Sequence, residues 1–250
     1  MTRTRSVILG AVGFVAFLLI WEALPAFHIV PSSVLPPPSA LPQAFWRELS
    51  SGIWFTSVLT SLRNYLSGLL IGSTLGIALG VATGLSATLE SFLSWIVRVL
   101  RPIPGLAWIP FAILWFGIDP AAAIFIISTG VFWICYFAAL GSVHSVDRDL
   151  IEVADAFGFR RTDQKLIKII LPAATPGILV GLRTAIGQAW MAVVASEIFG
   201  VPGLGQRMMQ ASNLLASDIV VIYMATMALL YGLIDSIFVT LQSWLLRWKR

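Results

Sequence analysis

Apolar residues in this chain form long blocks that polar or proline-rich stretches separate. Six blocks have the length of a membrane span, at about residues 6–24, 65–85, 91–118, 120–142, 174–198 and 218–245. An α-helix needs roughly 20 mostly apolar residues to cross a bilayer. The pattern therefore predicts an all-α integral membrane protein with about six spans, which form one transmembrane domain over residues 1–250.

Prolines mark where these helices are interrupted. Residues 25–55 are polar and contain three consecutive prolines at 36–38, a run that excludes a helix interior. The block 91–118 contains Pro102, Pro104 and Pro110, so we expect a broken span there. The first block follows Arg3 and Arg5 as a signal peptide would, but residues 25–27 make a poor cleavage site. We therefore expect a retained helix.

Composition supports a membrane protein. Apolar residues make up 58% of the chain, charged residues 11%, and the mean hydropathy is +0.90. A soluble domain has about 45–50% apolar and about 25% charged residues. These values exclude an ordinary soluble enzyme, a disordered protein and a secreted disulfide scaffold.

The positive charges predict the orientation. With the N-terminus in the cytoplasm, twelve basic residues fall on inner segments and two, Arg47 and Arg207, on outer ones. The inner residues are Arg3, Arg5, Arg98, Arg101, Arg148, Arg160, Arg161, Lys165, Lys168, Arg247, Lys249 and Arg250. We therefore expect both termini and the segment 143–172 to be cytoplasmic. Orientation accounts for the net charge of +4 without any nucleic-acid partner.

The chain lacks the residue patterns of a catalytic centre. The only cysteine, Cys135, excludes an intrachain disulfide, and the two histidines, His28 and His144, are too far apart to suggest a zinc-type site. No G-x-x-x-x-G-K-[ST] phosphate loop occurs. We expect no catalytic residue, no metal site and no cofactor in this chain.

Glycines recur every four residues along the second block. They are Gly68, Gly72, Gly76, Gly80 and Gly84. Because four residues turn an α-helix by about 400°, these positions form one slowly drifting stripe. A stripe without side chains permits close approach of another helix, so it predicts tight packing and indicates no chemistry.

The segment 143–172 has the local features of a helix–turn–helix. Residues 149–157 favour a helix, and Gly158 suits the position after its end, where φ becomes positive. A second short helix with one apolar face follows, and we expect Pro172 to end it. Such an element suits docking of a cytoplasmic partner, although local physics equally permits a solvated connector.

The same segment resembles the EAA loop of bacterial ABC importer permeases, whose pattern is E-A-A-x(3)-G-x(9)-I-x-L-P. The matching residues are Glu152, Ala154, Gly158, Leu171 and Pro172, and Phe159 and Arg160 follow the glycine. Gly158 to Pro172 is 14 positions, one more than the pattern has. The extra residue either rotates the second helix by about 100° or is absorbed by the turn. Segments 101–110, 114–117, 181–183 and 195–197 are similar to the nitrate/sulfonate/taurine-type branch of this family.

The resemblance implies a type I importer permease without its own ATPase. The loop 143–172 would dock as a coupling helix on one of two cytoplasmic ABC ATPases, which bind ATP and Mg. A second permease copy, as a homodimer, and a periplasmic solute-binding protein complete the expected assembly in the bacterial inner membrane. The branch includes permeases for sulfonates, taurine, nitrate and bicarbonate, so we expect a small anionic solute. A thiamine- or pyrimidine-type precursor is the alternative.

Five residues are candidates for the translocation pathway: Arg183, Trp133, Tyr136, Trp190 and Met191. Arg183 either attracts an anion or extends to the inner headgroups, and aromatic residues at helical spacing are more often packing residues or interfacial anchors. Glu197 is expected to act as a cap or ion-pair partner at the outer interface. Asp235 is expected to pair with another helix, whose partner residue the sequence does not identify.

Other classes of membrane protein fit the sequence less well. A self-contained secondary transporter would have an internal repeat. No repeat is evident between residues 1–125 and 126–250, and the prolines at 102–110 have no counterpart in the second half. A membrane-embedded enzyme would need clustered acids or histidines, which the sequence does not offer.

Overall fold

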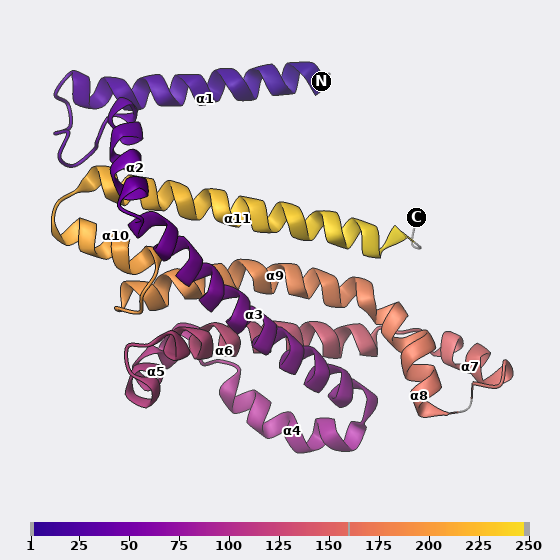
Figure 1. Cartoon of the computed structure of the whole chain (residues 1–250). Helices are drawn as coiled ribbons and strands as arrows, with labels where there is room; N and C mark the ends of the chain where they lie inside the picture. Colours follow the sequence, from indigo (N-terminus) through magenta and orange to yellow (C-terminus); the bar gives the residue numbers. More distant parts are fainter. Residues whose placement is uncertain (1–2, 160, 248–250) are drawn as a thin grey trace.

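The computed structural model describes residues 3–159 and 161–247, and all regular elements in these ranges are helical (Figure 1). The helices are α1 (Arg3–Ala26), α2 (Leu41–Ser50), α3 (Ile53–Leu85), α4 (Ala87–Leu100), α5 (Ile109–Phe116), α6 (Pro120–His144), α7 (Arg148–Ala156), α8 (Thr162–Lys165), α9 (Leu171–Ile198), α10 (Leu204–Asn213) and α11 (Ser217–Leu245). Two 3₁₀ turns, Pro38–Ala40 and Gly105–Trp108, and a π-helical segment, Leu166–Ile170, complete the elements.

Five helices in the described ranges are long and apolar enough to cross a membrane: α1, α3, α6, α11 and the helix that ends with α9. A sixth candidate crossing is α4 together with the segment Gly105–Phe116, two helical pieces that are bent by 80° relative to each other. The predicted all-α membrane fold is confirmed. The bend falls at Pro102 and Pro104, because proline cannot donate the backbone hydrogen bond that would continue the helix.

The second span is longer than its apolar block. We predicted 65–85, whereas α3 begins at Ile53, directly after Gly52 with φ +75°. The hydroxyls of Thr56 and Thr60 donate to carbonyls one turn earlier, so these polar side chains stay within the helix without unpaired groups. The polar residues scattered over 56–64 interrupt the apolar pattern between the first turn of α3 and the predicted span.

The centre of the bundle is α6, which packs against α3 on one side and α9 on the other. Helices α10 and α11 pack beside α9, whereas α1 lies apart from the central helices (Figure 1). Most apolar side chains of α1 are exposed, including Phe14 at 62% and Leu19 at 65%. Exposed apolar faces of this kind are expected of helices that lipid or further subunits cover.

The glycine stripe brings α3 into backbone contact with α6, as predicted. A Cβ atom added at Gly72 would lie 2.5 Å from the Ser128 carbonyl oxygen, and one added at Gly76 would lie 2.5 Å from that of Phe132. A Cβ atom added at Gly68 would lie 2.6 Å from the Ile127 side chain, and one added at Gly84 would lie 2.9 Å from the Val143 side chain. Any side chain at these positions would push two backbones apart.

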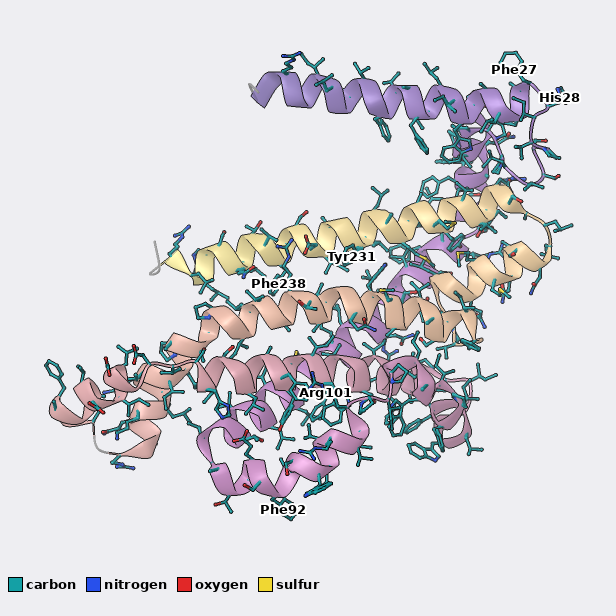
Figure 2. All side chains as sticks on the ribbon, turned by 180° about the vertical axis from the view of Figure 1, so that it is seen from behind. Phe27, His28, Phe92, Arg101, Tyr231 and Phe238 are labelled. Carbon is teal, nitrogen blue, oxygen red and sulfur yellow. The ribbon has the colours of Figure 1, made fainter. Side chains whose placement is uncertain are left out.

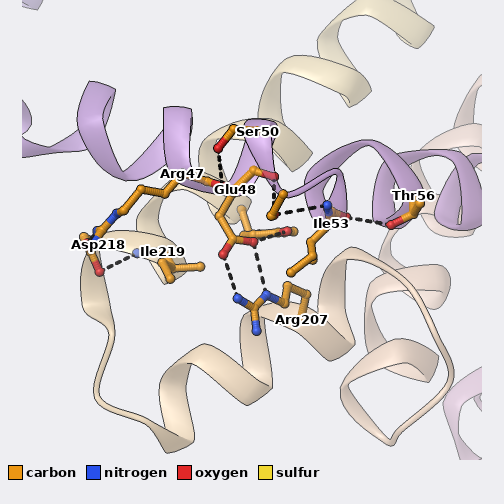
Figure 3. A network of polar contacts seen from close by, with 10 residues as sticks. Arg47, Glu48, Ser50, Ile53, Thr56, Arg207, Asp218 and Ile219 are labelled. Atoms are coloured by element: carbon orange, nitrogen blue, oxygen red, sulfur yellow. Dashed lines mark hydrogen bonds and ion pairs between the residues drawn. The ribbon is translucent and has the colours of Figure 1, made fainter.

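A polar network joins α2, α10 and α11 at the end of the bundle opposite α7 (Figures 1 and 3). The Glu48 carboxylate accepts hydrogen bonds from both Arg207 Nη2 (2.6 Å) and Nε (3.1 Å), and from the Tyr223 hydroxyl (2.8 Å). The Glu48 side chain is 6% exposed. The hydrogen bond from Arg207 lowers the pKa of Glu48 below its ordinary value, against the opposing effect of burial. A more exposed pair, Arg47–Asp218 at 2.7 Å, lies beside it.

Gly76→Val tests the backbone contact between α3 and α6. The new side chain meets a carbonyl oxygen that cannot move independently, so we expect destabilisation of about 1–3 kcal/mol, as for an overpacked core. Thermal unfolding of the detergent-solubilised protein measures it. Gly13→Val on α1 is the control, because nothing lies within 4 Å of a Cβ there. Equal melting temperatures for the two variants would contradict the role of the stripe.

Glu48→Gln tests the Glu48–Arg207 pair through its pH dependence. Because the folded-state pKa of Glu48 lies below the unfolded value of about 4.3, the stabilisation is present above that pH and is lost as the pH falls through the folded-state pKa. We expect the variant to be less stable than wild type by about 2 kcal/mol at pH 7, and the difference to shrink below about pH 4. Thermal unfolding between pH 3.5 and pH 7 measures this, in intervals of about half a unit.

Asp218→Asn is the matched control for Glu48→Gln. It removes an ion pair whose arginine is 64% exposed, and such pairs contribute about 0–1 kcal/mol. If Asp218→Asn lost as much stability as Glu48→Gln, the burial of the Glu48–Arg207 pair would not be the source of its stabilising effect.

Candidate functional site

The loop between α6 and α9 extends from one end of the bundle as a pair of short helices, α7 and α8 (Figure 1). The first turns of α1 and the last turns of α11 lie toward this same end of the molecule. The helix that the sequence predicts at 149–157 is present as α7, Arg148–Ala156. Of the seven residues predicted for this site, Arg160 lies outside the described residues.

Gly158 ends α7 in the predicted conformation, with φ +86°. The Phe159 N–H donates to the Ala154 carbonyl at 2.9 Å, which is the long hydrogen bond of a Schellman motif. The Lys168 ammonium lies 4.6 Å from the centre of the Phe159 ring and connects the turn to the returning segment. Gly158 therefore sets the direction in which the chain leaves α7.

One face of α7 packs inward and another is uncovered. Ala154 is 4% exposed, whereas Leu150, Val153 and Phe157 are exposed at 48%, 52% and 76%. Glu152 is also exposed. The spacing of i, i+3 and i+7 places the three exposed apolar residues on one side of the helix. This apolar strip borders an open groove of about 370 Å³, which Phe159, Lys168 and Ile169 line on the side of the returning segment.

Pro172 does not end the second helix, and this prediction was wrong. The chain is helical without a break from Asp163 to Ile198, with Pro172 in the first turn of α9, next to Leu171. The Leu171 N–H donates to the Leu166 carbonyl, a π-type bond that shifts the hydrogen-bond ladder directly before the proline. Proline is tolerated in the first turn of an α-helix because its missing N–H has no partner there.

The π-helical segment also bears on the extra residue between Gly158 and Pro172. A π turn closes its hydrogen bonds from i to i+5, so it holds one more residue than an α turn. Leu166–Ile170 lies within the interval that is one residue longer than the family pattern. The helix itself thus accommodates an additional residue, which neither sequence-based alternative anticipated.

Arg183 forms a bidentate ion pair with Asp235 of α11. The distances are 3.0 Å from Nε to Oδ1 and 2.9 Å from Nη2 to Oδ2. This identifies the partner of Asp235 that the sequence left open. The guanidinium already faces a carboxylate, so an anion would have to compete with Asp235 for it.

The four other pathway candidates do not gather at one cavity. Trp190 is 7% exposed and packs edge-to-face against Tyr65 at 5.4 Å, within the core between α3 and α9. Met191 is 66% exposed on the outer face of α9. Trp133 packs against Tyr136 of the same helix, and Tyr136 lines an open cavity beside α4. Their contact with a solute stays a prediction.

Glu197 caps the N-terminus of α10. Its side chain is fully buried and accepts hydrogen bonds from the Ser61 hydroxyl (2.6 Å) and the Gly205 N–H (2.9 Å). The Ser61 oxygen in turn accepts the Leu204 N–H at 2.9 Å. This arrangement ties α3, α9 and α10 together. Within residues 3–159 and 161–247, no three His, Cys, Asp or Glu side chains are grouped so as to hold a metal ion.

Arg98 and Arg101, which the charge pattern assigned to an inner segment, lie at the end of α4 away from the α3–α4 turn and line a cavity of about 460 Å³. The signal that would have located them is the helical spacing of Glu90, Ser94, Arg98 and Arg101. The positive-inside rule counts charges in loops and does not apply to a charge that faces a cavity.

Comparison with known proteins identifies the family. Residues 72–250 match the family described as binding-protein-dependent transport system inner membrane component. The chain is 36% identical to the permease protein SsuC of Escherichia coli (strain K12), whose name assigns it to aliphatic sulfonates, over 94% of this chain and 89% of that protein. It is 31% identical to the taurine transport system permease protein TauC of the same organism, with 98% and 91% covered. Identity to the bicarbonate transport system permease protein CmpB of Synechococcus elongatus is 32%, with 98% and 91% covered.

A solved structure shows the same fold. The inward-facing MetNI methionine ABC transporter contains a chain that superimposes with a TM-score of 0.69 at 21% identity, covering 79% of this chain and 98% of that one. At this identity the likeness establishes the helical arrangement and nothing about the solute. The family match over residues 72–250, with these relatives, shows that this chain belongs to the inner-membrane permease components of binding-protein-dependent ABC transport systems.

Proposed function

We propose that this chain is the membrane subunit of an ATP-driven importer and that α7 and its flanking turn dock on the ATPase. The observation that carries the proposal is the uncovered apolar strip on α7, formed by Leu150, Val153 and Phe157. A short helix that protrudes from the bundle with exposed apolar residues favours a protein partner, because water is a poor environment for such a strip.

The turn at Gly158 gives this docking element a defined direction. The Schellman hydrogen bond and the contact of Lys168 with Phe159 hold α7 against the segment that continues into α9. A push on α7 is then transmitted to a membrane-crossing helix through a continuous helical backbone. The expected contact set is Glu152, Ala154, Gly158, Phe159, Arg160, Leu171 and Pro172.

The proposed assembly contains two copies of this chain, two ATPases and a periplasmic solute-binding protein. ATP and Mg would bind to the ATPases, and both termini of the permease would lie in the cytoplasm of a bacterial cell, beside the docking loops. A two-fold axis between the permeases presents two equivalent loops to two equivalent ATPases. The solute would be delivered at the opposite end, near the network of Glu48 and Arg207.

We propose a small anion as the solute. The relatives SsuC, TauC and CmpB are named for sulfonates, taurine and bicarbonate, which all carry an anionic group. Arg183, Trp133, Tyr136, Trp190 and Met191 are the sequence-based candidates for the pathway, and Tyr136 is the one that lines an open cavity.

Recovery of the ATPase from detergent-solubilised membranes tests the docking loop. We expect the tagged wild-type chain to recover an ABC ATPase and Glu152→Ala/Gly158→Val to lose it. Valine at φ +86° is strained by about 1–2 kcal/mol or more, so the turn would reorganise and redirect α7. Co-purification from cells that express the neighbouring ATPase gene is the measurement.

Gly141→Val is the matched control, because this glycine has nothing within 4 Å of an added Cβ and lies in α6 without a positive φ. It should recover the ATPase as well as wild type does. Retention of the ATPase by the double variant would place the docking surface elsewhere. Absence of an ATPase with the wild-type chain would overturn the importer proposal.

A further inference from the structure

A cavity of about 460 Å³ lies between α4 and α6. Its α4 wall contains Glu90, Ser94, Val97, Arg98 and Arg101, with Pro102 beyond them. Its α6 wall contains Tyr136, Phe137 and Leu140. Figure 2 shows Arg101 beside α6, on the side of α4 that faces the bundle.

The two faces of α4 differ sharply in character. At 100° per residue, Glu90, Ser94, Arg98 and Arg101 fall within about 80° of one another, which makes one polar stripe. The opposite face holds Phe92, Trp95 and Val99, exposed at 74%, 70% and 65%. Phe92 points away from the bundle (Figure 2). A helix of this kind presents its apolar side to lipid and its polar side to water or to a polar ligand.

The two arginines carry charge that no described carboxylate neutralises. The Arg101 guanidinium lies 4.4 Å from the centre of the Phe137 ring, and that of Arg98 lies 5.1 Å from the Trp95 ring. Neither forms a salt bridge within residues 3–159 and 161–247. The acidic residue of the stripe, Glu90, lies three turns away and faces His144 at 3.7 Å. Arg183, by contrast, is paired with Asp235.

Their depth makes lipid an unsuitable environment. Arg101 follows the last residue of α4, which begins at Ala87 beside the α3–α4 turn, so it lies about 20 Å along the helix from that turn. Arginines at membrane depth almost always face the bundle interior or a water-filled cavity, because the charge is costly to place in hydrocarbon. The cavity is therefore expected to contain water or an anion.

We propose that this cavity binds the anionic group of the transported solute, with Arg98 and Arg101 as its two cationic ligands. The inference rests on the proposed importer function and adds a location for the solute within it. Residues three apart on a helix are neighbours, so both guanidiniums can contact one sulfonate or carboxylate. The rings of Tyr136 and Phe137 line the adjoining wall, which suits the short carbon chain of an organic anion. Glu90, at the far end of the stripe, disfavours an anion there.

Thiol labelling tests whether the cavity is open to water. In a Cys135→Ala background, which removes the chain's single, buried cysteine, we expect Ser94→Cys to react with the anionic reagent 2-sulfonatoethyl methanethiosulfonate in nanodiscs. Phe92→Cys on the opposite face is the matched control. Its labelling rate should be lower than that of Ser94→Cys by at least about tenfold. Taurine or ethanesulfonate at saturating concentration should slow the labelling of Ser94→Cys.

Uptake kinetics test the two arginines. In cells with the binding protein and ATPase, we expect Arg101→Gln to raise the KM for taurine or ethanesulfonate by about tenfold, the change that about 1.4 kcal/mol of lost binding produces. Arg101→Lys keeps the charge and should recover most of this loss. Arg247→Gln, an exposed arginine outside the cavity, should leave uptake unchanged.

The outcomes separate the two proposals. Equal labelling of Ser94→Cys and Phe92→Cys would show that lipid or a second copy fills the cavity, and would overturn the anion site. Labelling of Ser94→Cys with an unchanged KM in Arg101→Gln would overturn it as well. Labelling does not need the ATPase, so failure to recover an ATPase would count against the importer function and not against an aqueous cavity.

Discussion

Backbone contact between α3 and α6 is the constraint on which the rest of the bundle depends. In a bilayer, lipid is as apolar as leucine, so helices gain little from hydrophobic burial against each other and rely on close packing. Five glycines on α3 remove the side chains that would prevent it, and the Ser128 and Phe132 carbonyls take their place. On its other side α6 meets α9, where Gly177 and Gly181 face Ser142 and Ala138. With two faces of α6 fixed in this way, the remaining aromatic face is left to line the cavity with α4.

Charged side chains in this protein fall into three classes that have different physical roles. The pairs Glu48–Arg207 and Arg183–Asp235 connect helices and leave little charge for a ligand. Glu197 is buried without a cation, and backbone and hydroxyl donors satisfy it, so its role is to cap α10. Arg98 and Arg101 form the third class, because they pair with no described carboxylate and line a cavity. An uncompensated charge beside a cavity, in a chain whose buried carboxylates Glu48 and Glu197 are satisfied, is the feature that indicates a binding site.

The loop after α6 combines a fixed turn with an uncovered surface. Gly158 holds a positive φ with open space around it, so the requirement for glycine comes from the backbone and not from crowding. From Asp163 onward the chain continues through the π-helical segment Leu166–Ile170 into α9 without a break. A rigid connection of this type suits the transmission of movement from a cytoplasmic partner to a membrane helix, whereas a flexible loop would dissipate it.

The sequence by itself determined the features that depend on local or periodic patterns. Hydropathy located the spans, the four-residue glycine repeat predicted the close contact, and the residues around Gly158 predicted the end of α7. The start of α3 at Ile53 and the continuation through Pro172 were not predicted. Hydroxyls such as that of Thr56 pair with carbonyls of their own helix, so the polar residues there do not interrupt α3. A π turn precedes Pro172, so the proline does not end the helix. Only the tertiary structure decided which charges meet. Arg183 pairs with Asp235, which lies 52 residues later in the sequence, and Glu48 pairs with Arg207, which lies 159 residues later. Arg98 and Arg101 pair with no carboxylate among the described residues. Which charges pair depends on which helix faces lie together. The packing of the helices decides this, and the hydropathy and spacing patterns of a single sequence do not show it.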